Sequence, residues 1–313
     1  MVPRFKVAFD PVHQYINLGD DALALIDTPE YQRLRDLKQL GACYFIFPGA
    51  SHNRFEHSLG VHHLSGLMVN HFATTQPELR ITEQETTYVR LAGLVHDLGH
   101  GPFSHVFDGQ FIPTVRPGEN WHHESMSAAL LDTLLDDNDV GVLDEPYEAG
   151  DAADSLPVEL RSGGTRDVCG RDVVKFMLHP PEPPPAAPGT ARVATSYDET
   201  CVEYRRRRSS GGTAALHGQS SRDFLFQIVA NAHTGIDTDK FDYLARDSHN
   251  LGLASSFDYR RVMYSARVMP NGQVAYHAKE AMAMNEMFHT RYRLFRTIYL
   301  HRATRCVSPL ALA

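Results

Sequence analysis

The alternation of apolar and polar positions over residues 1–135 predicts helices joined by tight turns. Two segments carry apolar residues at helical spacing, namely Leu59, Leu64, Leu67 and Met68, and then Val89, Ala92, Leu94, Val95 and Leu98. Thr82 and Glu85 form a predicted capping box before the second segment, and Gly99 ends it. A further helix is predicted over 125–134. The pattern is typical of a mainly α fold.

The pattern is helical again after residue 222. The run Phe224–Val229 predicts a helix, and Asn271-Gly272 between apolar runs predicts a two-stranded hairpin. Apolar positions then predict one long amphipathic helix from Met284 to Tyr299. The predicted fold class is therefore mainly α, a helical bundle with a small β-hairpin.

The composition changes between residues 136 and 221. This stretch contains an acidic run, a proline cluster at 180–188, four consecutive arginines from Arg205 and a Ser/Gly run. Such a composition buries too little apolar surface to offset the entropy of ordering, so we expect a disordered low-complexity insertion. Only 173–179 predicts a short helix. The expected division is 1–135, the insertion 136–221, and 222–313.

Composition and charge exclude several classes of protein. The 313 residues have a formal charge of −8, which disfavours a general nucleic-acid binder. The four cysteines are scattered without a CxxC pair, against a disulfide scaffold or a Cys-based zinc site. No run of about 18 apolar residues and no signal peptide is evident, so we expect an intracellular protein of the nucleus or cytoplasm without a membrane span.

Histidine is abundant, with 18 residues, and one pair stands where a metal could bind. His96-Asp97 ends an apolar helix beside a glycine-rich turn, with His57 upstream and Asp239 downstream as further candidate ligands. Histidine and carboxylate together suit Zn, Fe, Mn or Mg. The dipeptide alone is equally consistent with a chance surface pair.

The set of motifs is more specific than the dipeptide. HNRFEHS, HDLGHGPFSH, HHES and DTDKFDYLARD occur in this order. The chain resembles the HD phosphohydrolase superfamily, and more narrowly the SAM- and HD-domain-containing deoxynucleoside triphosphate triphosphohydrolases of animals and their eukaryotic relatives. The resemblance covers 1–135 and 222–302. It implies an HD-domain helical bundle and metal-dependent hydrolysis of dNTPs to deoxynucleoside and inorganic triphosphate.

The resemblance implies a role for each matching residue near the reacting phosphate. The metal ligands would be His57, His96, Asp97 and Asp239, holding one divalent ion (Fe, Zn or Mn). Three further histidines, His100, His105 and His123, would face the α-phosphate. His105 or His123 would donate the proton to the departing 5′-oxygen, with His122 as an alternative to its neighbour.

The resemblance also implies the residues that bind the rest of a dNTP, which carries its own Mg. These are Gln39, Leu40, Arg54, Lys240, Tyr243, Asp247, Arg291 and Tyr299. Arg54, Lys240 and Arg291 match phosphate contacts. Gln39 and Asp247 match the pair that binds the sugar 3′-hydroxyl. Leu40 and Tyr299 match residues that crowd the 2′ position, although ordinary core packing explains them equally well.

A last set concerns regulation. Lys6, Val7, Asp27, Gln32, Arg35 and Arg261 match positions that bind activating nucleotides in the family, so GTP or dGTP is the expected activator. The resemblance implies a homo-oligomer, a tetramer in the family. The hairpin loop is shorter than the family's, and an arginine expected near Ala278 is missing. We expect the SAM module to be absent and the C-terminal lobe to be missing, which puts assembly in question.

Two alternative functions remain open at this point. The chain could be another HD-domain phosphohydrolase that acts on monophosphate, cyclic or alarmone nucleotides, although Gln39, Leu40 and Arg54 disfavour this. It could also be a nucleotide- or single-strand-binding protein without turnover. The product formed from dGTP and a divalent metal would separate the three hypotheses.

Overall fold

The structure is a computed structural model that describes residues 5–310 except 120, 148–167, 179–221, 232–233, 255–256 and 271. Its first half contains β1 (Phe5–Asp10), β2 (Gln14–Gly19), α1 (Asp20–Ile26), α2 (Pro29–Gln32), η1 (Arg33–Asp36), η2 (Gly41–Phe45), α3 (Arg54–Thr75), η3 (Pro77–Leu79), α4 (Glu83–Val95), η4 (Phe107–Phe111), α5 (Ile112–Val115) and α6 (His123–Asp137). The second half contains α8 (Gly170–Leu178), η6 (Asp223–Gln227), α10 (Thr238–Asn250), α11 (Tyr259–Tyr264), β3 (Ala266–Val268), β4 (Val274–Tyr276), η7 (Ala278–Glu280), α12 (Ala281–Leu294), η8 (Phe295–Tyr299) and α13 (Arg302–Leu310). The predicted mainly α fold class is confirmed.

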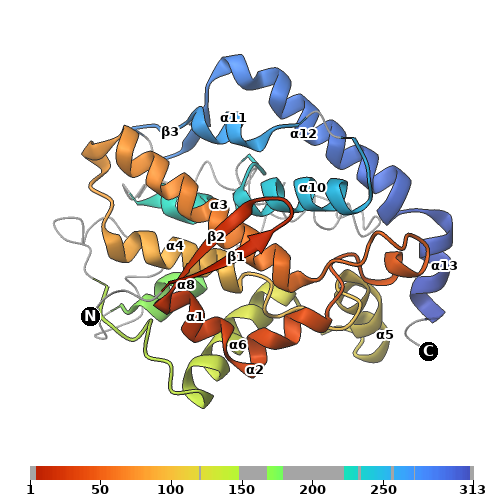
Figure 1. The fold of residues 1–313 in the computed structure, drawn as a ribbon. Helices are drawn as coiled ribbons and strands as arrows, with labels where there is room; N and C mark the ends of the chain where they lie inside the picture. Colours follow the sequence, from red (N-terminus) through yellow and green to blue (C-terminus); the bar gives the residue numbers. More distant parts are fainter. Residues whose placement is uncertain are drawn as a thin grey trace, which may run out of the picture.

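Helices α3, α4 and α10 form the centre of the molecule (Figure 1). Helix α3 begins with a capping box between Asn53 and Glu56. Helix α4 begins with the predicted box, in which Glu85 N donates to Thr82 Oγ1 at 3.1 Å and Thr82 N donates to Glu85 Oε2 at 2.9 Å. These side chains satisfy backbone groups that have no partner within the helix. The caps therefore fix the residues at which α3 and α4 start. This sets the position along each helix axis of the side chains that the helix carries.

The helix predicted within the insertion exists and belongs to the core. Helix α8 packs against α4 and α6. Its apolar face is buried and consists of Val173, Val174, Met177 and Leu178. The proline cluster and the four arginines fall outside the described residues. Disorder from residue 136 onward was a wrong expectation for 136–147, which the structure describes, because α6 continues to Asp137 and Leu143 is buried in the core. The domain division at 135 and 221 stays a prediction.

The structure contains two hairpins where the sequence pattern predicted one. Strands β3 and β4 pair antiparallel as predicted, with Asn271 outside the described residues. The expectation that the first 135 residues are helical was wrong for 5–19, because β1 and β2 also pair, with Phe5 opposite Gly19 and Asp10 opposite Gln14. The turn uses Gln14 at φ 66° instead of an Asn-Gly pair, so the usual turn signal was missing.

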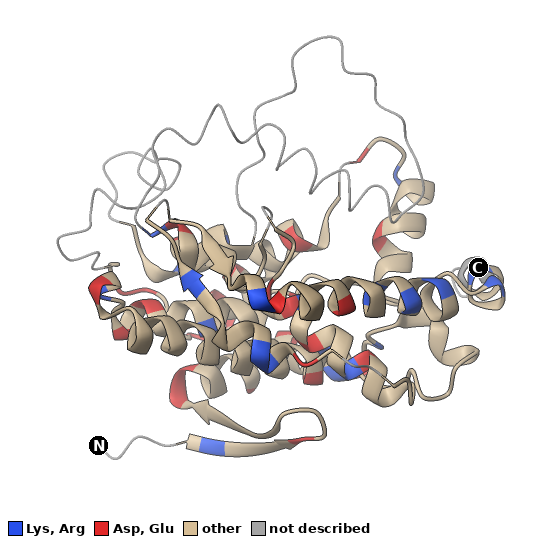
Figure 2. Cartoon of the chain, turned by 90° about the horizontal axis from the view of Figure 1, so that it is seen from above, with Lys and Arg blue, Asp and Glu red and all other residues tan. Residues whose placement is uncertain are grey.

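The C-terminal part is a long helix followed by a short one. Helix α12 continues into the π-helical turn η8, so the predicted amphipathic helix runs to Tyr299. The predicted helix after residue 222 is the short 3₁₀ helix η6. Basic residues recur toward the C-terminus (Figure 2), and 287–310 contains five arginines and no acidic residue. Among the described residues, no helix is long and apolar enough to cross a membrane.

Candidate active site

The four predicted metal ligands come together where three helices meet. His57 lies in the first turn of α3, His96 and Asp97 directly follow α4, and Asp239 lies in the first turn of α10. His57 Nε2 lies 3.2 Å from His96 Nε2, 3.1 Å from Asp239 Oδ1 and 3.5 Å from Asp97 Oδ2. His96 Nε2 lies 3.5 Å from Asp97 Oδ1 and 3.6 Å from Asp239 Oδ1. We call these four residues the metal quartet.

The hydrogen bonds around the two histidines leave their facing nitrogens free for a cation. His57 Nδ1 donates to Asp242 Oδ2 at 2.7 Å, and His96 Nδ1 donates to the carbonyl oxygen of Gly93 at 2.8 Å. Because each ring donates from Nδ1, the neutral tautomer carries a lone pair on Nε2. The two lone pairs lie within 4.8 Å of a carboxylate oxygen of Asp97, and Asp239 Oδ1 lies against both histidines. This donor set fits a single divalent metal ion.

The electrostatics of the quartet favour a positive charge at its centre. Burial opposes ionisation of Asp97, yet Arg54, His96 and His100 hold its pKa well below the usual value. Burial likewise opposes a charge on His57, but Asp239 and Asp242 outweigh it and raise the pKa of His57 to about 10. The site therefore attracts either a proton or a metal ion. A metal ion would replace the proton, since a ligating imidazole must be neutral.

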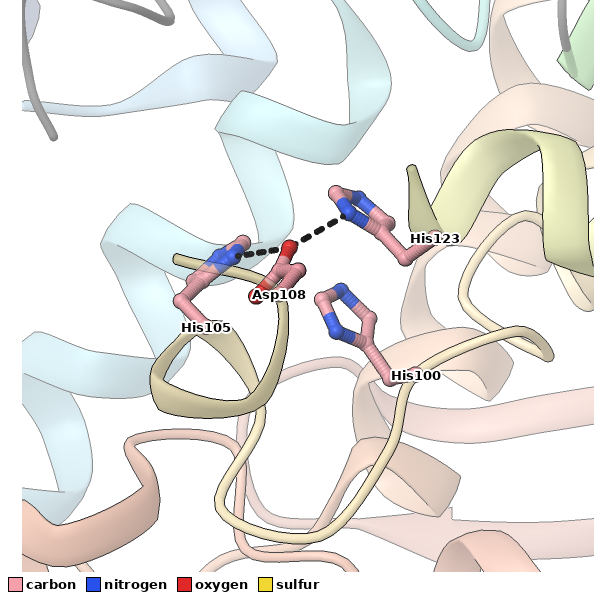
Figure 3. Close-up of side chains that lie close together, drawn as sticks. All are labelled: His100, His105, Asp108 and His123. Atoms are coloured by element: carbon pink, nitrogen blue, oxygen red, sulfur yellow. Dashed lines mark hydrogen bonds and ion pairs between the residues drawn. The ribbon is translucent and has the colours of Figure 1, made fainter. Parts of the chain in front are cut away.

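A second group of side chains, three histidines and one aspartate, lies close together (Figure 3). Asp108 Oδ2 accepts from His123 Nδ1 at 3.0 Å and lies 3.5 Å from His105 Nδ1. His100 stacks on His123 with ring centroids 3.9 Å apart, and its Nε2 lies 3.3 Å from Asp97 Oδ1. We call His100, His105, Asp108 and His123 the histidine cluster. It contacts the quartet through His100.

The electrostatics of the histidine cluster suit proton transfer. One ligand atom from each of its four residues lies within 4.8 Å of the others, and the rings of His100 and His123 stack at 20°. Burial opposes the charge on His123, but Glu124 and Asp108 raise its pKa to about 9. Burial, Arg54 and His123 lower the pKa of His100 instead. Neighbouring histidines thus hold different protonation states, as acid–base chemistry requires.

The local chain geometry decides that His123, and not His122, enters the cluster. Gly99 packs against the start of α6, where a Cβ would lie 2.2 Å from the carbonyl oxygen of His123. Gly99 N donates to Ser127 Oγ at 2.8 Å, and Ser127 Oγ donates to the carbonyl oxygen of His96 at 2.7 Å. These bonds attach α6 to the end of α4. They bring the His123 ring over His100.

Two of the predicted phosphate-binding cations are buried on carboxylates. Arg54 is 2% exposed and contacts Asp97, and its Nε donates to Ser104 Oγ at 2.9 Å. Lys240 is 1% exposed, with its Nζ 3.5 Å from Asp237 Oδ1. Arg54 contacts the predicted metal ligand Asp97, and Lys240 directly follows the predicted ligand Asp239 in sequence. Their role in binding phosphate stays a prediction.

The predicted sugar-binding residues form a second network. Asp247 Oδ1 lies 2.7 Å from His52 Nε2, and its other oxygen accepts from the Tyr299 hydroxyl. Gln39 N donates to the carbonyl oxygen of His52 at 3.0 Å, and Gln39 Oε1 is buried without a hydrogen-bond partner. Three of the four predicted residues therefore share one network. Leu40 is half-buried against the core.

The two remaining substrate candidates lie on α10 and α12. Tyr243 is half-buried against the core, one turn after Asp239. The Arg291 guanidinium carbon lies 4.4 Å from the ring centroid of Phe295. Their contact with a nucleotide stays a prediction.

Five of the six predicted regulatory residues lie on β1, directly after α1, in α2 and in η1, and four of the five are exposed. Lys6 Nζ lies 3.8 Å from Asp27 Oδ2, with side chains 68% and 64% exposed. Gln32 Oε1 accepts from Arg35 Nε at 2.7 Å. We call Lys6, Val7, Asp27, Gln32 and Arg35 the regulatory surface. Arg261 lies on α11, where its Nε contacts Glu280 Oε2 at 2.7 Å.

Sequence reasoning missed three residues that hold the site together. Asp108 orients His105 and His123, Asp242 binds His57, and His52 binds Asp247. Asp108 follows His105 by three residues and Asp242 follows Asp239 by three, so helical spacing could have indicated both. His52 stands in a loop, where no periodicity could indicate its partner.

Residues 54–150 match the HD domain family, and this range contains three of the four residues of the metal quartet. The chain is also similar to deoxynucleoside triphosphate triphosphohydrolase SAMHD1 of Gallus gallus, with 41% identity over 304 residues, covering 95% of this chain and 43% of that protein. The human protein of the same name is 38% identical over 312 residues, covering 99% and 44%. The SAMHD1 homolog of Dictyostelium discoideum is 36% identical over 302 residues, covering 96% and 47%.

These identities confirm the resemblance inferred from the motifs. They cover 95–99% of the chain, whereas the HD match ends before Asp239. The chain spans less than half the length of each of these three relatives.

Proposed function

We propose that the chain hydrolyses dNTPs to deoxynucleoside and inorganic triphosphate with one divalent metal ion. The observation that carries the proposal is the convergence of the metal quartet, with the Nε2 atoms of His57 and His96 3.2 Å apart and both Nδ1 atoms donating elsewhere. The similarity to proteins named deoxynucleoside triphosphate triphosphohydrolase gives the substrate class. Fe, Zn and Mn all suit the donor set.

The proposed mechanism divides the work between the two groups of side chains. A divalent ion held by the quartet would lower the pKa of a water toward ~7, which supplies a nucleophile for the α-phosphorus at neutral pH. The protonated His123, or His105 beside it, donates a proton to the departing 5′-oxygen. Asp108 holds both rings in place for this transfer. General acid catalysis of this kind contributes about 10²–10⁴-fold in rate.

The finer specificity follows from the sugar network. Gln39 and Asp247 would bind the 3′-hydroxyl, and Leu40 and Tyr299 would leave no room for a 2′-hydroxyl. The buried, unpartnered Gln39 Oε1 supports this, because a buried acceptor without a donor is costly until a ligand supplies one. Arg54, Lys240 and Arg291 would bind the phosphates, with Mg on the nucleotide, and Tyr243 would contact the sugar.

The proposed regulation uses the regulatory surface and Arg261. A guanine nucleotide would bind with its N1–H and N2–H groups donating to Asp27, while Lys6 and Arg35 contact its phosphates. Binding there would drive assembly into a homo-oligomer. Activity in the nucleus or cytoplasm, where dNTPs are made and used, is the expected setting.

The direct test incubates the chain with dGTP and Mn²⁺ and separates the products by anion-exchange chromatography. The proposal expects deoxyguanosine and inorganic triphosphate in equal amounts. Orthophosphate or dGMP would identify a different HD-domain phosphohydrolase. Binding without any product would support the competing hypothesis of a single-strand-binding protein, which the arginine-rich segment 287–310 favours.

A further inference from the structure

Asp242 is a buried carboxylate that the proposed mechanism does not use. It lies on α10, one turn after Asp239, and is 0% exposed. Its Oδ2 accepts from His57 Nδ1 at 2.7 Å and from Arg246 Nε at 2.9 Å. Its Oδ1 accepts from His13 Nε2 at 2.5 Å and from Arg246 Nη2 at 2.9 Å. Asp242 therefore joins a metal ligand to two residues remote from the metal.

The backbone of α3 leaves space for this carboxylate. Gly60 lies three residues after His57, and a Cβ at this position would lie 1.8 Å from Asp242 Oδ1 and 2.6 Å from Arg246 Nη2. Any side chain at residue 60 would therefore push the Asp242–Arg246 pair away from α3. The absence of a side chain lets Asp242 reach His57 from the neighbouring helix.

The network continues into the turn between β1 and β2, which lies beside α10 (Figure 1). Arg246 Nη1 donates to Asp10 Oδ2 at 2.7 Å, and Asp10 Oδ1 accepts from His13 N at 2.8 Å. His13 Nδ1 accepts from the Tyr259 hydroxyl at 2.9 Å, so its Nε2 donates to Asp242. Asp10 and Arg246 are both buried. The hairpin is thus attached to the metal centre by ionic hydrogen bonds.

We propose that Asp242 is a positioning residue that sets the tautomer and orientation of His57, and that the β1–β2 turn holds Asp242 in place through Asp10, His13 and Arg246. The inference rests on the metal site of the proposed function. It makes metal affinity depend on the hairpin that also carries Lys6 and Val7 of the regulatory surface.

The physical reason lies in the second hydrogen bond of a ligating histidine. An imidazole that donates from Nδ1 to a carboxylate presents a fixed, more basic Nε2 to a metal, and loss of such a partner costs about 10–100-fold in metal affinity. A carboxylate whose two oxygens both accept hydrogen bonds from one guanidinium has a fixed orientation. Arg246 provides this hold, and Asp10 in turn fixes Arg246.

The first variant is Asp242→Asn, which keeps the shape of the side chain. An amide can donate to His57 Nδ1 and so favour the tautomer with the proton on Nε2. Mn²⁺ affinity, measured from the electron paramagnetic resonance signal of the free ion, should fall about 10–100-fold. In the Zn²⁺-loaded chain labelled with ¹⁵N-histidine, where the ring is neutral, the His57 signal, assigned with His57→Gln, should show the Nδ1–H tautomer in the unmodified chain and lose this pattern in Asp242→Asn.

The second variant tests the outer link without touching His57. Asp10→Asn keeps the turn and weakens the contact to Arg246, so Mn²⁺ affinity should fall by a smaller factor than in Asp242→Asn. The matched control is Glu85→Gln, which weakens a buried carboxylate contact to Arg222 at 3.1 Å in the first turn of α4, whereas His96 follows the last turn. Its Mn²⁺ affinity should equal that of the unmodified chain even if its melting temperature falls.

The outcomes separate this inference from the proposed function. An unmodified chain that binds no Mn²⁺ contradicts the metal site and overturns the inference with it. Binding by the unmodified chain, with the same Mn²⁺ affinity and the same His57 tautomer in folded Asp242→Asn, overturns the inference alone. If Asp242→Asn does not fold, Asp10→Asn decides, and an affinity equal to that of Glu85→Gln overturns the inference.

Discussion

The metal quartet lies at the buried ends of three packed helices, whereas the regulatory surface lies on an exposed hairpin and the helices that follow it. His57 and Asp97 are 1% and 4% exposed, and each contacts several partners from other helices. The side chains of Lys6 and Asp27 are more than half exposed and contact each other. The chain therefore surrounds His57 and Asp97 with its own side chains, leaves His96 and Asp239 partly exposed, and leaves Lys6 and Asp27 mostly exposed.

This difference in burial indicates which function depends on the chain's own side chains and which depends on a bound ligand. A site whose ligands are held by buried partners is preorganised, and metal binding costs little rearrangement. A pair of exposed ions contributes little stability by itself and is free to change partners. We therefore expect metal binding and chemistry to depend on single buried residues, and regulation to depend on what binds the exposed face.

The largest effect is expected from removing a quartet carboxylate. Asp239→Ala removes one of two charged ligands, so both bound metal, measured by mass spectrometry of the metal content, and triphosphate release should be lost. The exposed Asp36→Ala is the control and should retain both. Full metal content and activity in Asp239→Ala would show that the quartet is not the metal site.

A substitution in the histidine cluster should lower kcat and leave the amount of bound metal unchanged. His123→Asn removes the histidine that Glu124 and Asp108 keep protonated, so kcat should fall about 10²–10⁴-fold while metal content stays unchanged. His122→Asn is the matched control, because His123 belongs to the histidine cluster and His122 does not. An equal loss in both variants would contradict the assignment.

The regulatory surface should affect activation and leave basal chemistry unchanged. Asp27→Ala removes a carboxylate that would accept hydrogen bonds from guanine, worth about 1.5–3 kcal/mol, or roughly tenfold or more in the GTP concentration for half-activation. Triphosphate release is measured against GTP concentration, with Asp21→Ala, on the exposed side of α1, as the control. Unchanged GTP dependence in Asp27→Ala would remove this residue from the regulatory surface.

The smallest effect is expected from a substitution beside the predicted sugar site, measured as selectivity between dGTP and GTP. Leu40→Ala opens space beside the predicted 2′ position, and removing a few methyl groups from a contact changes selectivity by about 1–3 kcal/mol. The ratio of kcat/KM for dGTP over GTP should fall by roughly tenfold. A ratio equal to that of the unmodified chain, with a lowered melting temperature, would show that Leu40 only packs in the core.

The helices of the site could be predicted from the sequence because their signals are local. The capping box at Thr82 and Glu85 and the apolar stripe that follows it define α4 within one segment, and His96 stands at its end. The N-terminal hairpin was missed because its turn at Gln14 lacks the usual residues. The alternation that buries Ile16 and Leu18 was the available signal.

The partners of the site residues could not be predicted in the same way. Asp242 binds His57 across 185 residues, and Asp247 binds His52 across 195. Such pairs depend on how α10 packs against α3 and against the loop before it. The spacing of Asp239 and Asp242 places both on one face of a helix, but nothing in that spacing identifies the histidine that each meets.

The central claim, attack of an activated water on the α-phosphorus, is tested most directly by hydrolysis of dGTP in H₂¹⁸O with Mn²⁺. Mass spectrometry of both products locates the label. The account predicts one ¹⁸O in inorganic triphosphate and none in deoxyguanosine. Label in deoxyguanosine would mean attack at the 5′-carbon, and labelled orthophosphate would mean attack at the γ-phosphorus; either result would contradict the account.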